Sequence, residues 1–105
     1  MDENLFDVRT PLGFEVRLSR ARWQLVVTTK HPVMAGRQED VRITLVSPDE
    51  IRQSRTAADV FLFYQRERPR RWICAVVKRV GDDDAFLITA YPTNAIKEGE
   101  TIWTR

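Results

Sequence analysis

The stretch from Trp72 to Thr93 constrains the fold more than any other part of the chain. It contains two short apolar runs, 72–77 and 85–90, in which β-branched and aromatic residues are frequent, as they are in buried strands. Gly81 and three aspartates separate the runs and favour a turn. The sequence therefore predicts a central β-hairpin. Polar residues that interrupt its apolar pattern are candidates for function, because burying an unpaired polar group costs free energy.

The composition is that of a globular domain. The 105 residues are 43% hydrophobic and 30% charged, which suits a single core without covalent staples. No apolar run approaches the ~20 residues of a membrane-spanning helix, and the acidic N-terminus has no signal-peptide core. We therefore expect one domain, 1–105, located in the cytoplasm and without a membrane partner. One cysteine, Cys74, and one histidine, His31, provide neither a disulfide nor a zinc site, and we expect no cofactor.

Positive charge is concentrated in the middle of the chain. Residues 17–79 carry 14 Lys and Arg against 6 Asp and Glu, whereas the two ends are acidic. Arginine supplies 14 of the 17 basic residues, and its planar fork suits two-point contact with phosphate. A nucleic-acid partner and a merely solvated basic surface both fit this distribution.

The N-terminal half predicts a hairpin followed by two helices. Alternating apolar residues on both sides of the turn at 11–13 predict the hairpin. Ser19 is a candidate N-cap for a helix over 20–31 that a proline then stops. The β-branched run 26–29 also suits a strand. A second helix is predicted over 37–46.

The C-terminal half predicts a β-meander. Strands are expected at 51–55 and 60–65, the latter apolar on both faces and therefore central, with a charged loop at 66–71 and a turn of helix at 93–97. The fold class is α+β: two N-terminal helices packed on an antiparallel sheet of about four strands, preceded by a short β-hairpin. The expected parts are the N-terminal hairpin at 1–18, the helices at 19–46, the meander at 50–93 and the tail at 94–105.

His31 is the first candidate for proton transfer. It would lie at a helix C-terminus, where the helix dipole favours the protonated ring, and its pKa range suits a group that accepts and donates protons near neutral pH. The alternative is a structural histidine that caps the last helical carbonyls.

The core hairpin supplies further polar candidates. Lys78 could neutralise a phosphate or an oxyanion, Thr89 and Tyr91 could hydrogen-bond one, and Arg55 and Tyr64 close neighbouring strands. Thr89 and Tyr91 share one face of their strand, and Lys78 shares a face with the residue pair Cys74 and Val76. The strand register decides whether these two sets meet. Each residue also has an ordinary surface or sheet role.

The charged loop at 66–71 is a candidate nucleic-acid contact. Its arginines could grip a phosphate backbone beside aromatic faces, and a solvated hairpin tip is the alternative. Gly-rich phosphate loops and the usual metal and nucleophile motifs are missing from the sequence. The expected nucleic-acid-binding residues are Lys30, Tyr64, Arg66, Arg68, Arg70 and Arg71.

An ordered series of short motifs resembles one family. The series covers 20–103 and resembles small bacterial and phage proteins of the barnase, EndoU, colicin and RelE-like nuclease superfamily, most closely its phage-associated branches. It consists of Arg22-Trp23, Lys30-His31-Pro32, Gly36-Arg37, Asp40-Val41, Leu45 with Pro48 and Ile51, Tyr64, Val76-Val77-Lys78, Thr89-Ala90-Tyr91-Pro92-Thr93 and Ile96-Lys97-Glu98-Gly99.

The resemblance implies N-terminal helices on a four-stranded antiparallel sheet and metal-independent RNA cleavage, in which a ribose 2′-hydroxyl attacks the adjacent phosphate and leaves a cyclic phosphate. It implies His31 as general acid or base, and Lys78 and Arg55 as the cations that stabilise the charge. Thr89 and Tyr91 would position the phosphate or supply the second proton-transfer group. This chain has one histidine where some relatives use two.

The sequence thus leads to a hypothesis and two alternatives. The hypothesis is a metal-independent endoribonuclease, a toxin or phage-derived effector, with RNA as its partner. The first alternative is a catalytically inactive nucleic-acid-binding or protein-interaction module on the same scaffold. The second is a toxin whose working surface is covered by an antitoxin or immunity protein. A nuclease requires its candidate residues around one phosphate, whereas a binding module requires only a basic face.

Overall fold

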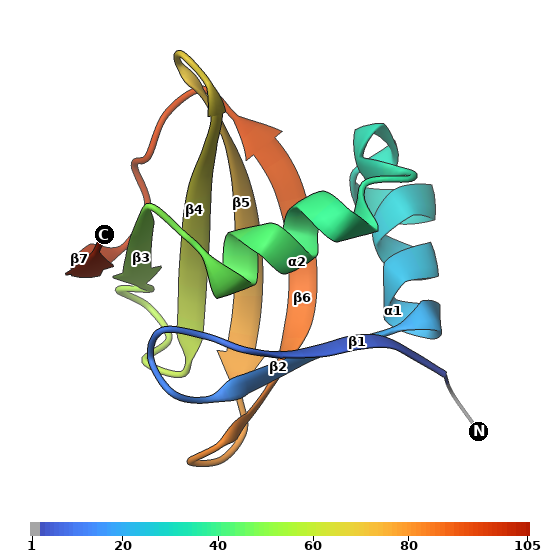
Figure 1. Cartoon of the computed structure of the whole chain (residues 1–105), viewed down its shortest axis with the longest axis horizontal. Helices are drawn as coiled ribbons and strands as arrows, with labels where there is room; N and C mark the ends of the chain where they lie inside the picture. Colours follow the sequence, from blue (N-terminus) through green and yellow to red (C-terminus); the bar gives the residue numbers. More distant parts are fainter. Residues whose placement is uncertain (1–2) are drawn as a thin grey trace.

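A computed structural model describes residues 3–105 and contains one seven-stranded sheet that curls around a helical layer (Figure 1). The spatial order of the strands is β1-β2-β6-β5-β4-β3-β7. The strands are β1 (Asn4–Arg9), β2 (Glu15–Ser19), β3 (Glu50–Gln53), β4 (Val60–Arg68), β5 (Arg71–Arg79), β6 (Asp84–Thr93) and β7 (Glu100–Thr104). The helical segments are α1 (Arg20–Leu25), the π-helical turn η1 (Val26–Lys30), the 3-10 turn η2 (Pro32–Met34) and α2 (Gln38–Val46).

The predicted α+β fold, two helices on an antiparallel sheet of about four strands, is wrong: the sheet has seven strands, the two α-helices are short and most of the regular structure is strand. The N-terminal hairpin does not precede a separate sheet but joins it, because β2 pairs with β6 in parallel, with Val16 opposite Ala85. All other strand pairs are antiparallel, so the sheet is mixed. The pairing of β2 with β6 joins segments far apart in the chain, and the periodicity of a single strand cannot reveal such a pairing. Residues 1 and 2 of the predicted hairpin lie outside the described residues.

The C-terminal tail supplies the seventh strand. No helical turn is present at the predicted position 93–97, and β7 instead pairs with β3, with Trp103 opposite Ile51. Gly99 permits the close approach of the chain before β7. It has a φ of +79°, and a Cβ there would lie 2.6 Å from the carbonyl oxygen of Gln53.

The first helix begins where the sequence predicts. The Ser19 hydroxyl accepts a hydrogen bond of 3.1 Å from the Arg22 backbone N–H, which is the expected N-cap. The β-branched run that could have formed a strand is helical, with π geometry. There the hydroxyls of Thr28 and Thr29 each donate a 2.6 Å hydrogen bond to a carbonyl four residues earlier, and such bonds distort a helix without ending it.

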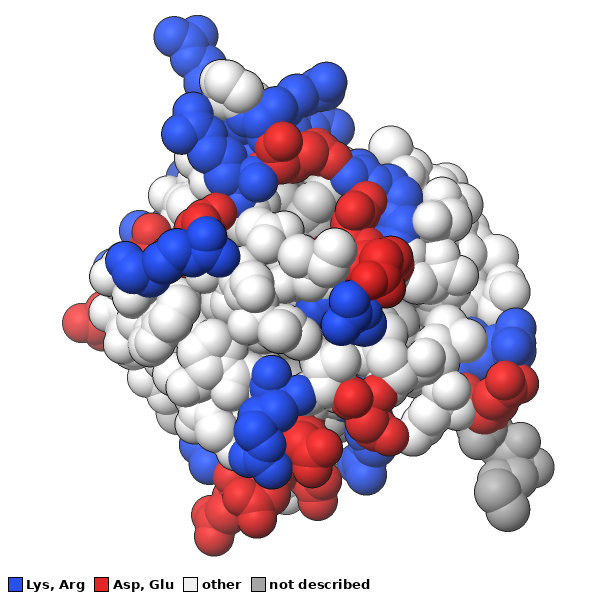
Figure 2. All heavy atoms as spheres, viewed as in Figure 1, with Lys and Arg blue, Asp and Glu red and all other residues white. Residues whose placement is uncertain are grey.

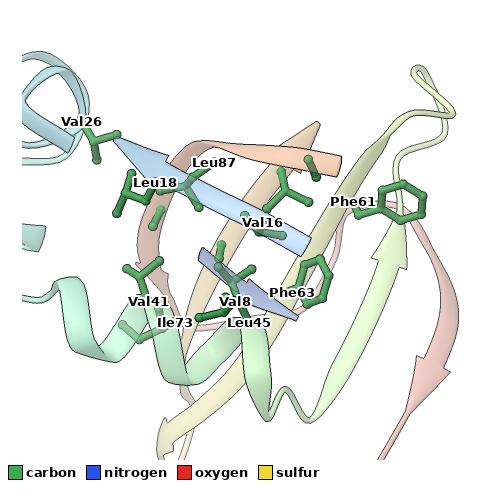
Figure 3. Packing of buried hydrophobic residues seen from close by; sticks show 14 of the residues in the cluster. Val8, Val16, Leu18, Val26, Val41, Leu45, Phe61, Phe63, Ile73 and Leu87 are labelled. Atoms are coloured by element: carbon green, nitrogen blue, oxygen red, sulfur yellow. The ribbon is translucent and has the colours of Figure 1, made fainter. Parts of the chain in front are cut away.

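The main core lies between α2 and the concave face of the sheet (Figure 3). Val41 and Leu45 of α2 are fully buried there, as their spacing of four predicts. Val16 and Leu18 of β2 alternate toward the same core. The opposite face of β4, β5 and β6 is hereafter called the outer face.

The charged segment at 66–71 is strand rather than loop for most of its length. β4 continues to Arg68 and β5 starts at Arg71, so the turn consists of Pro69 and Arg70. Arg70 has a φ of +61°, in the left-handed region that a tight turn requires. The tip of the hairpin extends beyond the rest of the sheet (Figure 1).

Candidate functional site

The outer face carries a second, smaller apolar cluster. Leu62, Tyr64 and Cys74 are its buried members. The cluster is completed by partly buried residues of β5, β6 and the segment after β6, namely Trp72, Val76, Tyr91 and Ile96. Most of the polar residues expected from the sequence lie on or beside this cluster.

His31 packs against Tyr91. Their ring centroids are 5.2 Å apart and the rings are inclined by 39°. His31 is held there by the end of η1, where its backbone N–H donates a 2.7 Å hydrogen bond to the Val26 carbonyl. A residue that ends a helix therefore meets the outward-facing tyrosine of β6, 60 positions later in the chain.

Thr89 is the next outward-facing residue of β6. It lies opposite Val76, as Tyr91 lies opposite Cys74. Its hydroxyl oxygen is buried and has no hydrogen-bond partner among residues 3–105. An unpaired buried hydroxyl costs about 1–3 kcal/mol, and a phosphate oxygen or a water would satisfy it once a shift of the surrounding side chains exposes it.

The register places Lys78 on the same face. Cys74, Val76 and Lys78 alternate on β5, and Val76 faces Thr89. Lys78 is thus a diagonal cross-strand neighbour of Thr89. Residues in these positions are about 7–8 Å apart, a distance that a long side chain can bridge. Its side chain is 47% exposed, and its Nζ lies 3.8 Å from Oδ2 of Asp59. Histidine, tyrosine, threonine and lysine therefore follow one another along the outer face.

Arg55 does not join this line. β3 ends at Gln53, earlier than predicted, because the Ser54 hydroxyl accepts a 3.2 Å hydrogen bond from the Thr56 backbone N–H and turns the chain. Arg55 is exposed in the loop that follows. The same loop contacts the line through Asp59, the partner of Lys78.

Tyr64 and Cys74 form a buried pair beside Tyr91. Tyr64 is only 2% exposed, so no base can stack on its ring in this structure. Burial raises the pKa of the Cys74 thiol to about 12, although hydrogen bonding with the two tyrosines acts in the opposite direction. Burial, followed by the neighbouring thiol, also raises the pKa values of Tyr64 and Tyr91. Both phenols carry their protons at neutral pH, as the ordinary tyrosine pKa of about 10 ensures, and both hydrogen-bond with the Cys74 thiol.

Glu98 is a residue that the sequence reasoning did not assign to the site. Its negative charge is among the causes that raise the pKa values of Tyr64, Cys74 and Tyr91, so its carboxylate acts on this part of the outer face. The segment that carries it packs on the cluster through Ile96. Both residues belong to the last motif of the family resemblance, which was the available signal.

The expected nucleic-acid-binding arginines gather on the β4–β5 hairpin, where Figure 2 shows a concentration of basic side chains. Arg66, Arg68 and Arg70 are exposed. Arg71 is partly buried and forms an ion pair: its Nε lies 3.7 Å from Oε2 of Glu67. Glu67 also pairs with Arg37, which precedes α2. Lys30 is exposed beside His31, at the other border of the outer face.

Residues 3–105 contain no group of three or more His, Cys, Asp or Glu side chains able to hold a metal ion. No helix within these residues has the length and apolar character needed to cross a membrane. No protein-family model, curated protein or solved structure matches the chain.

Proposed function

We propose that this protein is a metal-independent endoribonuclease that holds RNA along the outer face of its sheet. The observation that carries the proposal is the contact of His31 with Tyr91, continued by Thr89 and Lys78. A proton-transfer group, two hydroxyls and a cation thus follow one another on one surface. This combination serves the transfer of a phosphoryl group without a metal.

The chemistry of the four side chains fits an intramolecular transesterification. The His31 imidazole takes the proton of a ribose 2′-hydroxyl as that oxygen bonds to the adjacent phosphorus. The bond from phosphorus to the 5′-oxygen then breaks, and the proton passes from the imidazolium, directly or through water, to this leaving oxygen. The products are a 2′,3′-cyclic phosphate and a 5′-hydroxyl, and a single histidine suffices.

The other three residues stabilise the charge that develops on the phosphate. Tyr91 carries its proton at neutral pH, as phenols do, so it donates a hydrogen bond to a phosphate oxygen when it exchanges its contact with the Cys74 thiol for one with RNA. The Thr89 hydroxyl, which lacks a partner among the described residues, donates a second. Lys78 supplies a positive charge, provided that it leaves Asp59 when RNA binds.

RNA binding without cleavage is the second candidate function. It is favoured by the exposed arginines of the β4–β5 hairpin and by the absence of Arg55 from the outer-face line. A purely electrostatic contact with the phosphate backbone needs no arrangement of proton-transfer groups.

Incubation of the purified protein with structured and unstructured RNA in EDTA tests the proposal. Cleavage that leaves cyclic-phosphate ends is expected from the wild type and from Arg42→Ala, a control in α2 on the opposite side of the sheet. Binding of the same RNAs without any cleavage would instead establish the second candidate function.

A further inference from the structure

A cleft opens where β2 and β6 separate. The two strands pair only from Glu15 opposite Asp84 to Arg17 opposite Phe86, after which β6 continues toward Thr89 and β2 leads into α1. The cleft has a volume of about 260 Å³. It is lined by Asn4, Arg17, Ser19, Arg22, Phe86 and Leu87.

Three cationic residues are neighbours of Phe86, the aromatic residue of this cleft. The guanidinium carbon of Arg22 lies 5.7 Å from the Phe86 ring centroid. Arg17 and Lys78 are the cross-strand partners of Phe86 on its two sides, and cross-strand partners point to the same face. Arg17 forms a long, exposed ion pair of 4.0 Å with Asp84, and such an exposed pair contributes little free energy, so an anion can replace the carboxylate.

The cleft is continuous with the proposed site but separate from its reactive centre. Phe86 precedes Thr89 on β6, and the extra residue Ile88 between them forms a bulge. Tyr91 lies five positions after Phe86, which corresponds to about 16 Å at ~3.3 Å per residue. A ligand in the cleft would therefore lie along β6 from the phosphate at His31, at the level of Lys78, which pairs with Phe86.

We propose that this cleft is a subsite for one nucleotide of the RNA chain. Its phosphate contacts Arg17 and Arg22, and its base packs against the Phe86 ring at the cleft wall. An aromatic ring combined with arginines is the arrangement that binds single-stranded nucleic acid through stacking and charge. The inference rests on the proposed function, because that function supplies RNA as the ligand.

The test compares three small probes by NMR titration of the intact protein: 5′-AMP, adenosine and inorganic phosphate. We expect 5′-AMP to bind most tightly and to shift the resonances of Arg17, Arg22 and Phe86. Arg17→Gln and Arg22→Gln should each weaken 5′-AMP binding about tenfold. Arg42→Gln removes the same charge from α2 and should leave binding unchanged.

Phe86→Leu separates the base from the phosphate contribution. It should reduce the affinity for 5′-AMP to that for phosphate, and the unaffected affinity for phosphate would show that the variant is folded. The proposal is overturned if 5′-AMP binds wild-type protein no more tightly than phosphate, or if its shifts map to the β4–β5 hairpin instead.

The cleavage assay in EDTA keeps this inference distinct from the proposed function. If the protein cleaves RNA but its cleft does not bind 5′-AMP, the result contradicts the subsite and supports the nuclease proposal. Binding of 5′-AMP in the cleft of a protein that cuts no RNA would support the nucleotide site and contradict the nuclease.

Discussion

The imidazole ring of His31 and the phenol ring of Tyr91 lie 5.2 Å apart, centroid to centroid. His31 follows the helical turn η1, and Tyr91 is in β6, the second strand of the predicted core hairpin. Because the strand register also places Thr89 and Lys78 beyond Tyr91 on the outer face, this contact fixes one end of the proposed site. The following predictions examine its members separately.

Replacing Tyr91 by Phe removes the phenol while keeping the ring against His31. If the phenol donates to the developing phosphate charge, the cleavage rate should fall by about 100-fold. Tyr64→Phe is the matched control, because Tyr64 shares the same thiol neighbour but is buried. Rates measured on one RNA for both variants decide the question, and equal losses would assign Tyr91 a structural role only.

Thr89→Val should reduce cleavage without reducing stability. The Thr89 hydroxyl has no partner among the described residues, so its loss should leave the free energy of unfolding unchanged or raise it by about 1 kcal/mol. Thr44→Val is the same substitution with the opposite expected effects, because the buried Thr44 hydroxyl donates a 2.7 Å hydrogen bond to the Asp40 carbonyl. The free energy of unfolding of the Thr44→Val variant should fall by about 1 kcal/mol, and its rate of RNA cleavage should equal that of the wild type.

Urea denaturation and initial cleavage rates test the threonine pair. A Thr89→Val protein that cleaves RNA at the wild-type rate would remove this hydroxyl from the site. A marked loss of stability in the same variant would show that the hydroxyl has a partner in solution.

Arg70→Asn should weaken RNA binding in a salt-dependent manner. The exchange removes one charge from the tip of the β4–β5 hairpin and keeps a residue that tolerates the positive φ. We expect the slope of log affinity against log salt to fall by about 1, measured by fluorescence anisotropy on a short RNA. An unchanged slope would place the RNA away from the hairpin.

The raised pKa values predict a loss of stability in alkaline solution. The thiol of Cys74 has a reference pKa of 9.0 and a folded pKa of about 12, so the unfolded chain releases its proton at lower pH than the folded chain does. The stabilisation is complete below pH ~9 and decreases as the pH rises toward 12. Tyr64 and Tyr91 act in the same direction.

Urea midpoints between pH 8 and 11 check this pH dependence, with Cys74→Ala as the comparison. The urea midpoint of this variant should decrease less with rising pH than that of the wild type. A wild-type midpoint that stays constant over this range would contradict the buried, protonated cluster.

Local features of the fold followed from the sequence. Alternation of apolar residues predicted the first hairpin and the core hairpin, and Ser19 marked the start of the first helix. The sheet order did not follow, because the pairing of β2 with β6 and of β3 with β7 joins segments far apart in the chain. Side-chain alternation identifies the faces of a strand but not its neighbours.

The site was predictable to a similar extent. Alternation placed Thr89 and Tyr91 on one face, and only the register could add Lys78 to it. Arg55 was misplaced by a strand boundary two residues off. Glu98 was overlooked because it follows the last predicted strand and approaches the cluster only through the fold of the tail.

The most direct test of the central claim measures RNA affinity and cleavage rate together for wild-type protein and for His31→Ala. We expect the variant to remain folded, to bind RNA with nearly wild-type affinity and to cleave it at least 100-fold more slowly, because general acid–base catalysis contributes about 10²–10⁴-fold. Cleavage by His31→Ala at the wild-type rate would contradict the account.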